Sequence, residues 1–375
     1  MNLFDVYPRH EIEPVKGQGC SLWDKNGKKY LDLYCGHAVI SIGHSHPHYI
    51  SKVGSQLAKL GFYSNSVQIS PQGDLAKKLG ELSGYPDYDL FLCNSGAEAT
   101  ENAMKLASFH TGRKKIIAFE KAFHGRTSLA MEATDNRKQL APVNESGNLI
   151  RLPLNDLSAV AAAMDHSIAG IIVEGIQGIA GIFEPTTDFL QGLQKLSKDH
   201  RSLLILDEVQ SGYGRSGKFF AHQYHRVKPD IITTGKGMAN GFPMAGVLIS
   251  PKIEAWHGML GTTFGGNHLA CAAGLATLEI IEKENLILNA KEMGEYLVSA
   301  LNGVPGVVEV RGKGLMIGVE LEYPAKEVRA KLLFDYNIFT GSANNLNTLR
   351  ILPPLCVCTK ELDQLIMALK KITKT

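Results

Sequence analysis

The sequence lacks the apolar runs and the charge excess typical of membrane proteins and of proteins that bind nucleic acid. Nowhere among its 375 residues do about 18 apolar residues run together, which excludes a membrane-spanning helix. The formal net charge is only +2, without a run of like charges, so we expect neither nucleic acid nor a membrane surface as a partner. The first residues, from Met1 to Asp5, carry an early acid and no apolar block, so we expect no signal peptide.

Cysteine is scarce and irregularly spaced. The chain has six cysteines, and Cys356 and Cys358 form the only close pair, without the second pair that a zinc site needs. The framework spacing of small disulfide-rich secreted proteins is absent too. We therefore expect reduced thiols and a cytoplasmic protein.

What the chain does contain is an alternation of short apolar runs with helical patterns. Asn26-Gly27 separates two mostly extended runs and predicts a β-hairpin. Apolar runs predict strands at residues 90–93, 116–119, 168–173, 203–206, 231–232 and 247–249. Because these runs are apolar on both faces and helical patterns separate them, we predict a mainly parallel sheet covered by helices on both sides.

The pattern changes after about residue 255. A predicted helix over 269–284 leads into a mixed region with apolar runs at 307–310, 315–321 and 349–352. Since 375 residues are many for one core, we predict an α/β protein with two domains. Residues 46–260 form the large domain, and residues 1–45 and 261–375 form a smaller α+β domain.

Lys236 follows the predicted strand at 231–232 after a bend of small residues. Sites in open α/β sheets lie at the carboxyl ends of strands, so this position suits a functional amine. Taken alone, a lysine at such a place is more often simply solvated. Its meaning therefore depends on the other segments.

Asp207 and Glu208 follow four apolar residues at another predicted strand end. One of these acids could simply cap the next turn. Pyridoxal phosphate, however, requires a carboxylate beside its ring nitrogen, because the protonated ring is the electron sink. A nearby negative charge favours that protonated form. Asp207 suits this role, and Gln210 could reach the phenolic oxygen of the ring.

Two further segments could bind the rest of such a cofactor. Ser95, Gly96 and Ala97 lie between a predicted strand and a helix start, where free N–H groups and the helix dipole bind anions. Phe123 could stack on a flat ring, and Arg126 could hold a substrate carboxylate by two hydrogen bonds. Separately, each segment has a purely structural explanation: a helix start, a core aromatic and a surface ion pair.

Together these segments resemble the class III, ornithine-type aminotransferases, which are fold-type I pyridoxal-phosphate enzymes. The resemblance rests on Asp-Glu-Val-Gln at 207–210, Thr-Gly-Lys-Gly at 234–237 and Phe-His-Gly-Arg-Thr at 123–127. It extends over nearly the whole chain, from the hairpin at 23–27 to Leu-Arg-Ile-Leu-Pro-Pro at 349–354. Within this family it is greatest to the enzymes that act on acylated ornithine.

The resemblance implies roles for the matching residues around the cofactor, pyridoxal 5′-phosphate. Lys236 bonds covalently to the cofactor and later moves the proton between substrate and cofactor. Asp207 pairs with the ring nitrogen, Gln210 approaches the phenolic oxygen, and Phe123 packs on the ring. The phosphate site consists of Ser95, Gly96 and Ala97.

It also implies roles for residues that bind the amino acid and 2-oxo acid substrates. Arg350 holds a substrate α-carboxylate, and Arg126 holds a distal or alternative carboxylate. Thr262 lies near the substrate, whereas Thr263 contacts the cofactor phosphate of the neighbouring subunit. An active site shared in this way implies a homodimer.

Three other features have simpler interpretations. His44, His46 and His48 alternate, but the family carries a similar loop without a metal, so we expect no metal site. Residues 312–314, Gly-Lys-Gly, lack the Ser or Thr that completes a phosphate loop and predict a turn into the next strand. We expect His124 to form hydrogen bonds within its own turn.

The chain departs from its family at residue 179. Where the family has Glu-Pro-x-Gln-Gly-Glu-x-Gly, residues 174–181 read Glu-Gly-Ile-Gln-Gly-Ile-Ala-Gly. Glu174 is retained, but Ile179 replaces the glutamate that pairs, in relatives, with the arginine matching Arg350. One hypothesis is that this loss favours a charged acyl group such as succinyl over acetyl, because a buried carboxylate disfavours an anionic substrate. The alternative is neutral drift, with another residue shielding Arg350.

The resemblance therefore implies a transaminase of arginine biosynthesis that works in two half-reactions. Glutamate donates the amino group, and an N-acylated glutamate semialdehyde accepts it, with N-acetylornithine the expected product. Succinylornithine, ornithine and 4-aminobutyrate are alternative substrates. An aminomutase on the same scaffold would need no separate acceptor, and a catalytically silent ligand sensor would require neither Lys236 nor Asp207.

Overall fold

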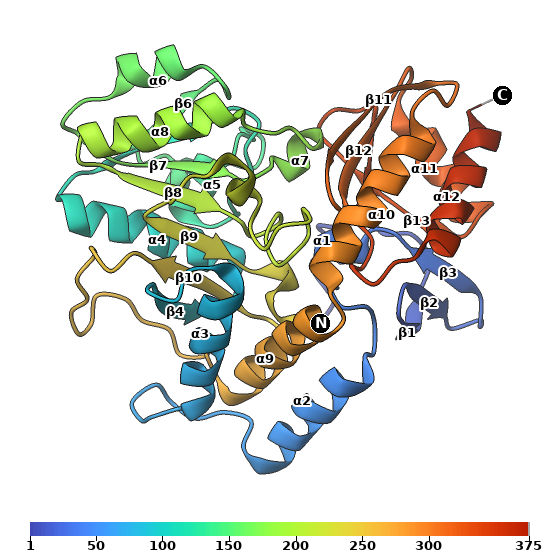
Figure 1. Ribbon diagram of the computed structural model, residues 1–375, viewed down its shortest axis with the longest axis horizontal. Coiled ribbons are helices and arrows are strands. Elements are labelled where there is room, and N and C mark those ends of the chain that lie inside the picture. The colour runs from blue at the N-terminus through green and yellow to red at the C-terminus, as the bar shows by residue number, and fades with distance from the viewer. Residues whose placement is uncertain (374–375) are drawn as a thin grey trace.

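The computed structural model describes residues 1–373, and its largest sheet has seven strands in the order β4-β10-β9-β8-β7-β5-β6 (Figure 1). These strands are β4 (Asp89–Cys93), β5 (Lys115–Phe119), β6 (Leu149–Leu152), β7 (Ile168–Glu174), β8 (Leu203–Asp207), β9 (Ile231–Thr234) and β10 (Ala245–Ile249). β6, β5, β7, β8 and β9 pair in parallel, and β10 is antiparallel to both of its neighbours. The predicted, mainly parallel sheet is confirmed.

Helices cover both faces of this sheet. α4 (Gly96–Thr111) packs on β7, β9 and β10, whereas α8 (Thr187–Asp199) packs on β7 and β8 and contacts α6 (Leu157–Ala163). Two separate apolar clusters contain the residues of the two faces. All seven residues of β7 are buried, which explains why this strand is apolar throughout rather than alternating.

Two smaller sheets lie beside the large one in Figure 1. The first contains β1 (Pro14–Gln18), β2 (Ser21–Asp24), β3 (Lys29–Asp32) and β13 (Ile338–Phe339). The second contains β11 (Val307–Lys313), β12 (Met316–Leu321), β15 (Thr348–Ile351) and β14 (Gly341–Ser342). Because β13 pairs with β3, segments from the two ends of the chain share one sheet. The division of the chain at residues 45 and 260 stays a prediction.

The remaining helices connect and cover these sheets. They are α1 (Cys35–Ala38), α2 (Pro47–Lys59), α3 (Ser70–Ser83), α5 (Ser128–Ala133), α7 (Gly178–Gly181), α9 (His268–Lys283), α10 (Leu286–Leu301), α11 (Ala325–Phe334) and α12 (Thr359–Ile372), with short 3₁₀ turns at Pro142–Asn144, Ala221–His225 and Lys236–Ala239. α9 packs against α2 and α3. Within residues 1–373, no helix combines the length and the apolar character needed to cross a bilayer.

Several local predictions are also confirmed. β2 and β3 form the antiparallel hairpin around Asn26-Gly27, and Gly27 has φ +80°, which suits glycine. Residues 312–314 lie where β11 turns into β12. β6 was not predicted, because Arg151 interrupts its apolar run and the strand lies at the edge of the sheet.

The three alternating histidines face three different acids. His44 bonds to Asp32, His46 to Glu284 and His48 to Glu279. Across the described chain, no group of three or more potential metal ligands gathers.

Candidate active site

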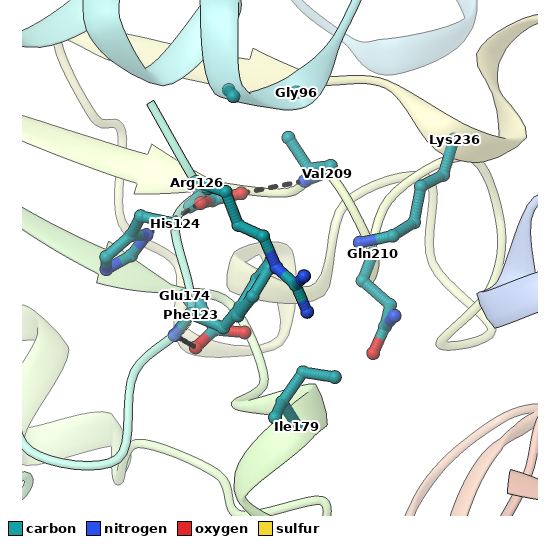
Figure 2. A pocket seen from close by; sticks show the side chains of 12 residues that line it. Gly96, Phe123, His124, Arg126, Glu174, Ile179, Val209, Gln210 and Lys236 are labelled. Atoms are coloured by element: carbon teal, nitrogen blue, oxygen red, sulfur yellow. Dashed lines mark hydrogen bonds and ion pairs between the residues drawn. The ribbon is translucent and has the colours of Figure 1, made fainter. Parts of the chain in front are cut away.

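The predicted functional residues converge where the parallel strands of the large sheet end. Asp207 ends β8, Glu174 ends β7 and Lys236 follows β9. They line a cavity of about 280 Å³ together with Gly96, Ala97, Phe123, His124, Gly125, Arg126, Ile179, Val209 and Gln210. Figure 2 shows Lys236 and Gln210 on one side of it and Phe123 and Arg126 on the other.

The N-terminus of α4 opens into this cavity. Ser95 caps the helix, its hydroxyl accepting a hydrogen bond from the Glu98 N–H at 3.2 Å. The N–H groups of Gly96 and Ala97, in the first turn, have no intrahelical acceptor and suit an anion. A Cβ on Gly96 would come within 2.7 Å of Val209 Cγ1, so only glycine lets the helix start lie this close to Val209.

Asp207 is held in place by two hydrogen bonds. Its Oδ2 lies 2.7 Å from Nδ1 of His124, and its Oδ1 accepts from the Val209 N–H at 3.0 Å. Both side chains are buried. Burial opposes a charge on His124, but the hydrogen bond to Asp207 and the negative charges of Asp207 and Glu174 outweigh it, so the His124 pKa is raised.

Glu174 links two segments of the cavity wall. Its Oε1 accepts from the Phe123 N–H at 3.0 Å and its Oε2 from the Gly178 N–H at 3.1 Å. Gly178 begins α7, the short helix that carries Ile179. Burial and the charge of Asp207 raise the Glu174 pKa to about 7, against the opposing effects of His124 and the two N–H groups.

Lys236 presents its amine to the cavity without a partner. Among residues 1–373 its Nζ has no hydrogen bond or ion pair, and its backbone has φ +43°, which is unfavourable for a lysine. Burial and the charge of Arg350 lower the Lys236 pKa, while Asp207 and Glu174 oppose that shift. A lowered pKa increases the neutral fraction of the amine, which is the nucleophilic form.

Arg350 does not line the cavity but is connected to it through Gln210. Arg350 is 2% exposed, and its guanidinium donates from Nη1 to Gln210 Oε1 at 3.3 Å, from Nη2 to the Tyr34 hydroxyl at 3.2 Å and from Nε to the Ser342 carbonyl. The other end of Gln210, Nε2, donates to the His37 carbonyl at 3.3 Å.

Thr262 and Thr263 lie outside the cavity of their own chain. Thr262 Oγ1 accepts from the Gly265 N–H at 3.0 Å and from Asn94 Nδ2 at 3.3 Å. Thr263 is exposed to solvent. Of the predicted residues, the structure therefore gathers seven around the cavity (Gly96, Ala97, Phe123, Arg126, Asp207, Gln210 and Lys236), while Ser95, Thr262, Thr263 and Arg350 lie beyond its wall.

Sequence reasoning missed three members of this site. The expectation that His124 bonds within its own turn is incomplete, because its side chain contacts Asp207, 83 positions away. Val209 lines the cavity through its place between Asp207 and Gln210, a signal that the motif itself contained. Tyr34, which contacts Arg350, lies in a segment without any recognisable motif.

The geometry agrees with comparisons to known proteins. Residues 6–373 match the model of the "Aminotransferase class-III" family. The chain belongs to the class III aminotransferase family. It is 40% identical to the acetylornithine aminotransferase of Bacillus subtilis, covering 99% of this chain and 97% of that one. It is 37% identical to the acetylornithine aminotransferase of Archaeoglobus fulgidus, covering 97% and 96%.

Solved structures show the same fold. The ornithine aminotransferase of Toxoplasma gondii ME49 superposes with a TM-score of 0.93 at 28% identity, covering 99% of this chain and 92% of that one. The acetylornithine aminotransferase of Elizabethkingia anophelis gives a TM-score of 0.86 at 31% identity, covering 99% and 96%. This chain is therefore a fold-type I, pyridoxal-phosphate-dependent transaminase.

The residues of this site fit pyridoxal phosphate. The unpartnered amine of Lys236 suits covalent attachment to its aldehyde, and the helix start at Gly96 and Ala97 suits its phosphate. The buried carboxylate of Asp207, with His124 behind it, suits the ring nitrogen. Phe123, which is half-buried in the cavity wall, provides an aromatic face for the ring.

Proposed function

We propose that this aminotransferase transfers an amino group between N-acylornithine, N²-acetylornithine above all, and 2-oxoglutarate. The relatives named acetylornithine aminotransferase support this assignment. The observation that carries it is one cavity that holds the unpartnered amine of Lys236 and the guanidinium of Arg126, with Arg350 bonded to the wall of that cavity through Gln210. Both the acylornithine and glutamate carry carboxylates that such guanidinium groups bind.

The proposed roles of the chain's residues follow from their positions. Pyridoxal phosphate supplies, when bound, the electron sink that carries the amino group between the substrates. Asp207 favours the protonated ring nitrogen, Gly96 and Ala97 with Ser95 hold the phosphate, and Phe123 stacks on the ring. Gln210 orients the phenolic oxygen.

Proton transfer and substrate binding fall to a second set of residues. Lys236 holds the cofactor and then moves the proton at the substrate carbon. Arg350 receives the α-carboxylate of the acylornithine, and Arg126 an alternative carboxylate. Thr262 borders the substrate.

A donor screen tests this function. The cofactor-loaded protein is mixed with glutamate, N-acetylornithine, N-succinylornithine, ornithine or 4-aminobutyrate, and the cofactor absorbance is followed in a single turnover. We expect loss of absorbance with glutamate and one acylornithine, reversed by 2-oxoglutarate. Turnover that needs no 2-oxoglutarate would instead indicate an aminomutase, and no loss with any donor would contradict the proposal.

We also propose a homodimer with shared active sites. Thr263 is exposed and does not line the cavity of its own chain, and in this proposal it binds the cofactor phosphate of the partner subunit. The two-domain division at residues 45 and 260 belongs to the same proposal. The six cysteines are free thiols throughout the described chain, which suits work in the cytoplasm.

Ile179 bears on the choice of acyl group. Its side chain lines the cavity below Phe123 and Arg126 (Figure 2), where the family has a glutamate. If the missing charge admits a succinyl group, Ile179→Glu should shift the kcat/KM ratio towards acetylornithine over succinylornithine. An equal ratio in the two proteins would indicate neutral drift.

A further inference from the structure

The segment between β3 and α2 contains a left-handed turn. Four consecutive residues, Cys35 to Ala38, have positive φ values of 46°, 55°, 70° and 66°. Only Gly36 among them adopts this conformation without strain. Backbone strain of this kind persists only where neighbouring groups enforce it, and it concentrates at functional sites.

Neighbouring groups do enforce this turn. The Asp32 carboxylate accepts from the N–H groups of Tyr34 and Cys35 at 3.1 and 2.8 Å. The Cys35 thiol donates to the Leu352 carbonyl at 2.8 Å, and Gln210 donates to the His37 carbonyl. Strand β3, the segment after β15 and the cavity wall thus hold the turn together, and the turn carries His37.

A chain of hydrogen bonds runs from Arg350 to His37. Arg350 Nη2 lies 3.2 Å from the Tyr34 oxygen, and that oxygen lies 2.5 Å from His37 Nδ1. A guanidinium can only donate, so the Tyr34 oxygen accepts from Arg350. We assign to His37 the tautomer whose Nδ1 carries no hydrogen, so that the Tyr34 hydroxyl donates its hydrogen bond to Nδ1. Nδ1 must therefore be unprotonated for the chain to form.

Arg350 depends on such neutral partners. Within residues 1–373 it forms no ion pair, and its three acceptors are a carbonyl, an amide and a phenol oxygen. The glutamate that would face it in relatives is Ile179 here. Three of its five N–H groups are used, which leaves one on each terminal nitrogen for a carboxylate.

We propose that His37 is a positioning residue for the substrate carboxylate: by accepting a hydrogen bond from the Tyr34 hydroxyl, it turns the lone pairs of the Tyr34 oxygen towards Arg350 and fixes the guanidinium. The proposal rests on the proposed function, in which Arg350 receives a carboxylate. His37 lies outside the sequence motifs described above.

Carboxylate binding should therefore depend on the charge of His37. The groups that face His37 are the Tyr34 hydroxyl, the Gln210 amide and the cations Arg350, Lys236 and Arg126. Burial and these three positive charges lower the His37 pKa. Protonation of Nδ1 would leave Tyr34 between two donors, so carboxylate binding should weaken as the pH falls through the His37 pKa.

The experiment compares the holoenzyme with His37→Gln, His37→Leu and Tyr34→Phe between about pH 4.5 and 8, a range that extends well below the ordinary histidine pKa of about 6.5 because the His37 pKa is lowered. KM and kcat are measured with the acylornithine. In the native enzyme KM should rise by up to about tenfold per pH unit below the His37 pKa, with kcat changing much less. His37→Gln retains a hydrogen-bond acceptor but cannot titrate. Its KM should therefore stay near the value of the native enzyme at neutral pH and should not rise as the pH falls.

The other two variants remove the acceptor or the hydroxyl. Each should raise KM by roughly tenfold at neutral pH, the usual effect of losing a hydrogen bond to a charged group, and neither should show the acid rise. A native pH profile in His37→Gln would overturn the proposal, and so would a native KM in His37→Leu.

Glutarate separates this proposal from the proposed function. This dicarboxylate has no amino group to transfer, so its Kd, measured by calorimetry on the same four holoenzymes, reports carboxylate binding alone. The same pattern of Kd values without acylornithine turnover would sustain the role of His37 and reject the substrate. Acylornithine turnover with identical Kd values for glutarate in all four proteins would support the proposed substrate and reject the role of His37.

Discussion

At the scale of single residues, the buried His124–Asp207 pair determines the charge at the centre of the site. The two side chains lie 2.7 Å apart and are almost completely excluded from solvent. A buried carboxylate that loses its partner is strongly destabilised, whereas removal of both charges is much less costly. The pair therefore offers a direct test of the local electrostatics.

We expect His124→Phe to destabilise the protein by about 3–5 kcal/mol, because Asp207 would keep only the Val209 N–H as a partner. The double variant His124→Phe/Asp207→Leu should lose less free energy of unfolding than the sum of the losses in the two single variants. Urea unfolding of the cofactor-free proteins measures both. Additive losses would show that the two side chains are not coupled.

Glu174 gives a second prediction at this scale. Its pKa of about 7 lies above its ordinary value of 4.5, so the folded chain binds more protons than the unfolded chain between those values. Its contribution to stability is therefore greatest below pH 4.5 and falls as the pH rises to about 7. Between these pH values we expect the free energy of unfolding of the native protein to fall by an amount on the order of 3 kcal/mol, and this fall should be absent in Glu174→Gln.

Thermal unfolding of the two cofactor-free proteins, at several pH values, measures that difference. The Tm of the native protein should fall relative to Glu174→Gln as the pH rises from 5 to 8. Parallel Tm curves would mean that Glu174 has the same pKa in the folded and unfolded chains.

At the scale of elements, the left-handed turn α1 makes Gly36 a sensitive position. A Cβ on Gly36 would meet no atom within 4 Å, so Gly36→Ala changes the backbone energy without a steric clash. We expect it to lower the free energy of unfolding by about 1–2 kcal/mol, the cost of left-handed conformation for an L-residue.

Gly73 is the matched control. It lies exposed in the right-handed helix α3, and a Cβ there would also meet nothing within 4 Å. Gly73→Ala should raise the free energy of unfolding by about 0.5–1 kcal/mol, because alanine favours a helix. Urea unfolding of the two variants should therefore give shifts of opposite sign, and shifts of the same sign would contradict the strained turn.

At the scale of the whole molecule, apolar side chains gather on the surface near Thr263. Leu57, Phe62 and Phe264 are 63%, 42% and 59% exposed, and the rings of Phe62 and Phe264 lie 5.4 Å apart. Such a patch indicates a surface that another protein covers. In the proposed homodimer, the partner subunit covers it.

We therefore expect Phe264→Lys to shift the protein towards a monomer and to weaken pyridoxal phosphate binding, because each site would lose the partner's Thr263. Val308→Lys is the control, since Val308 is equally exposed (62%) but lies on β11. Sedimentation and cofactor titration measure the two effects. A dimeric Phe264→Lys with native cofactor affinity would place the interface elsewhere.

Features of this molecule could be predicted from the sequence where they depend on local patterns, and could not where they depend on contacts between residues far apart in the chain. Strands such as β7 were predictable because burial on both faces demands a continuous apolar run. β6 was not, since Arg151 in an edge strand breaks that pattern. The contact between His124 and Asp207 spans 83 positions, and no local sequence pattern predicts it.

The sequence by itself therefore determined the fold class and predicted seven of the residues that line the cavity, because strand periodicity and the Asp207, Lys236 and Phe123 motifs are local patterns. The tertiary structure alone decided how those residues are charged and held. It placed His124 behind Asp207, buried Glu174 and brought Tyr34 to Arg350, 316 positions apart. Burial and long-range contacts set pKa values and hydrogen-bond direction, and both exist only once the chain has folded.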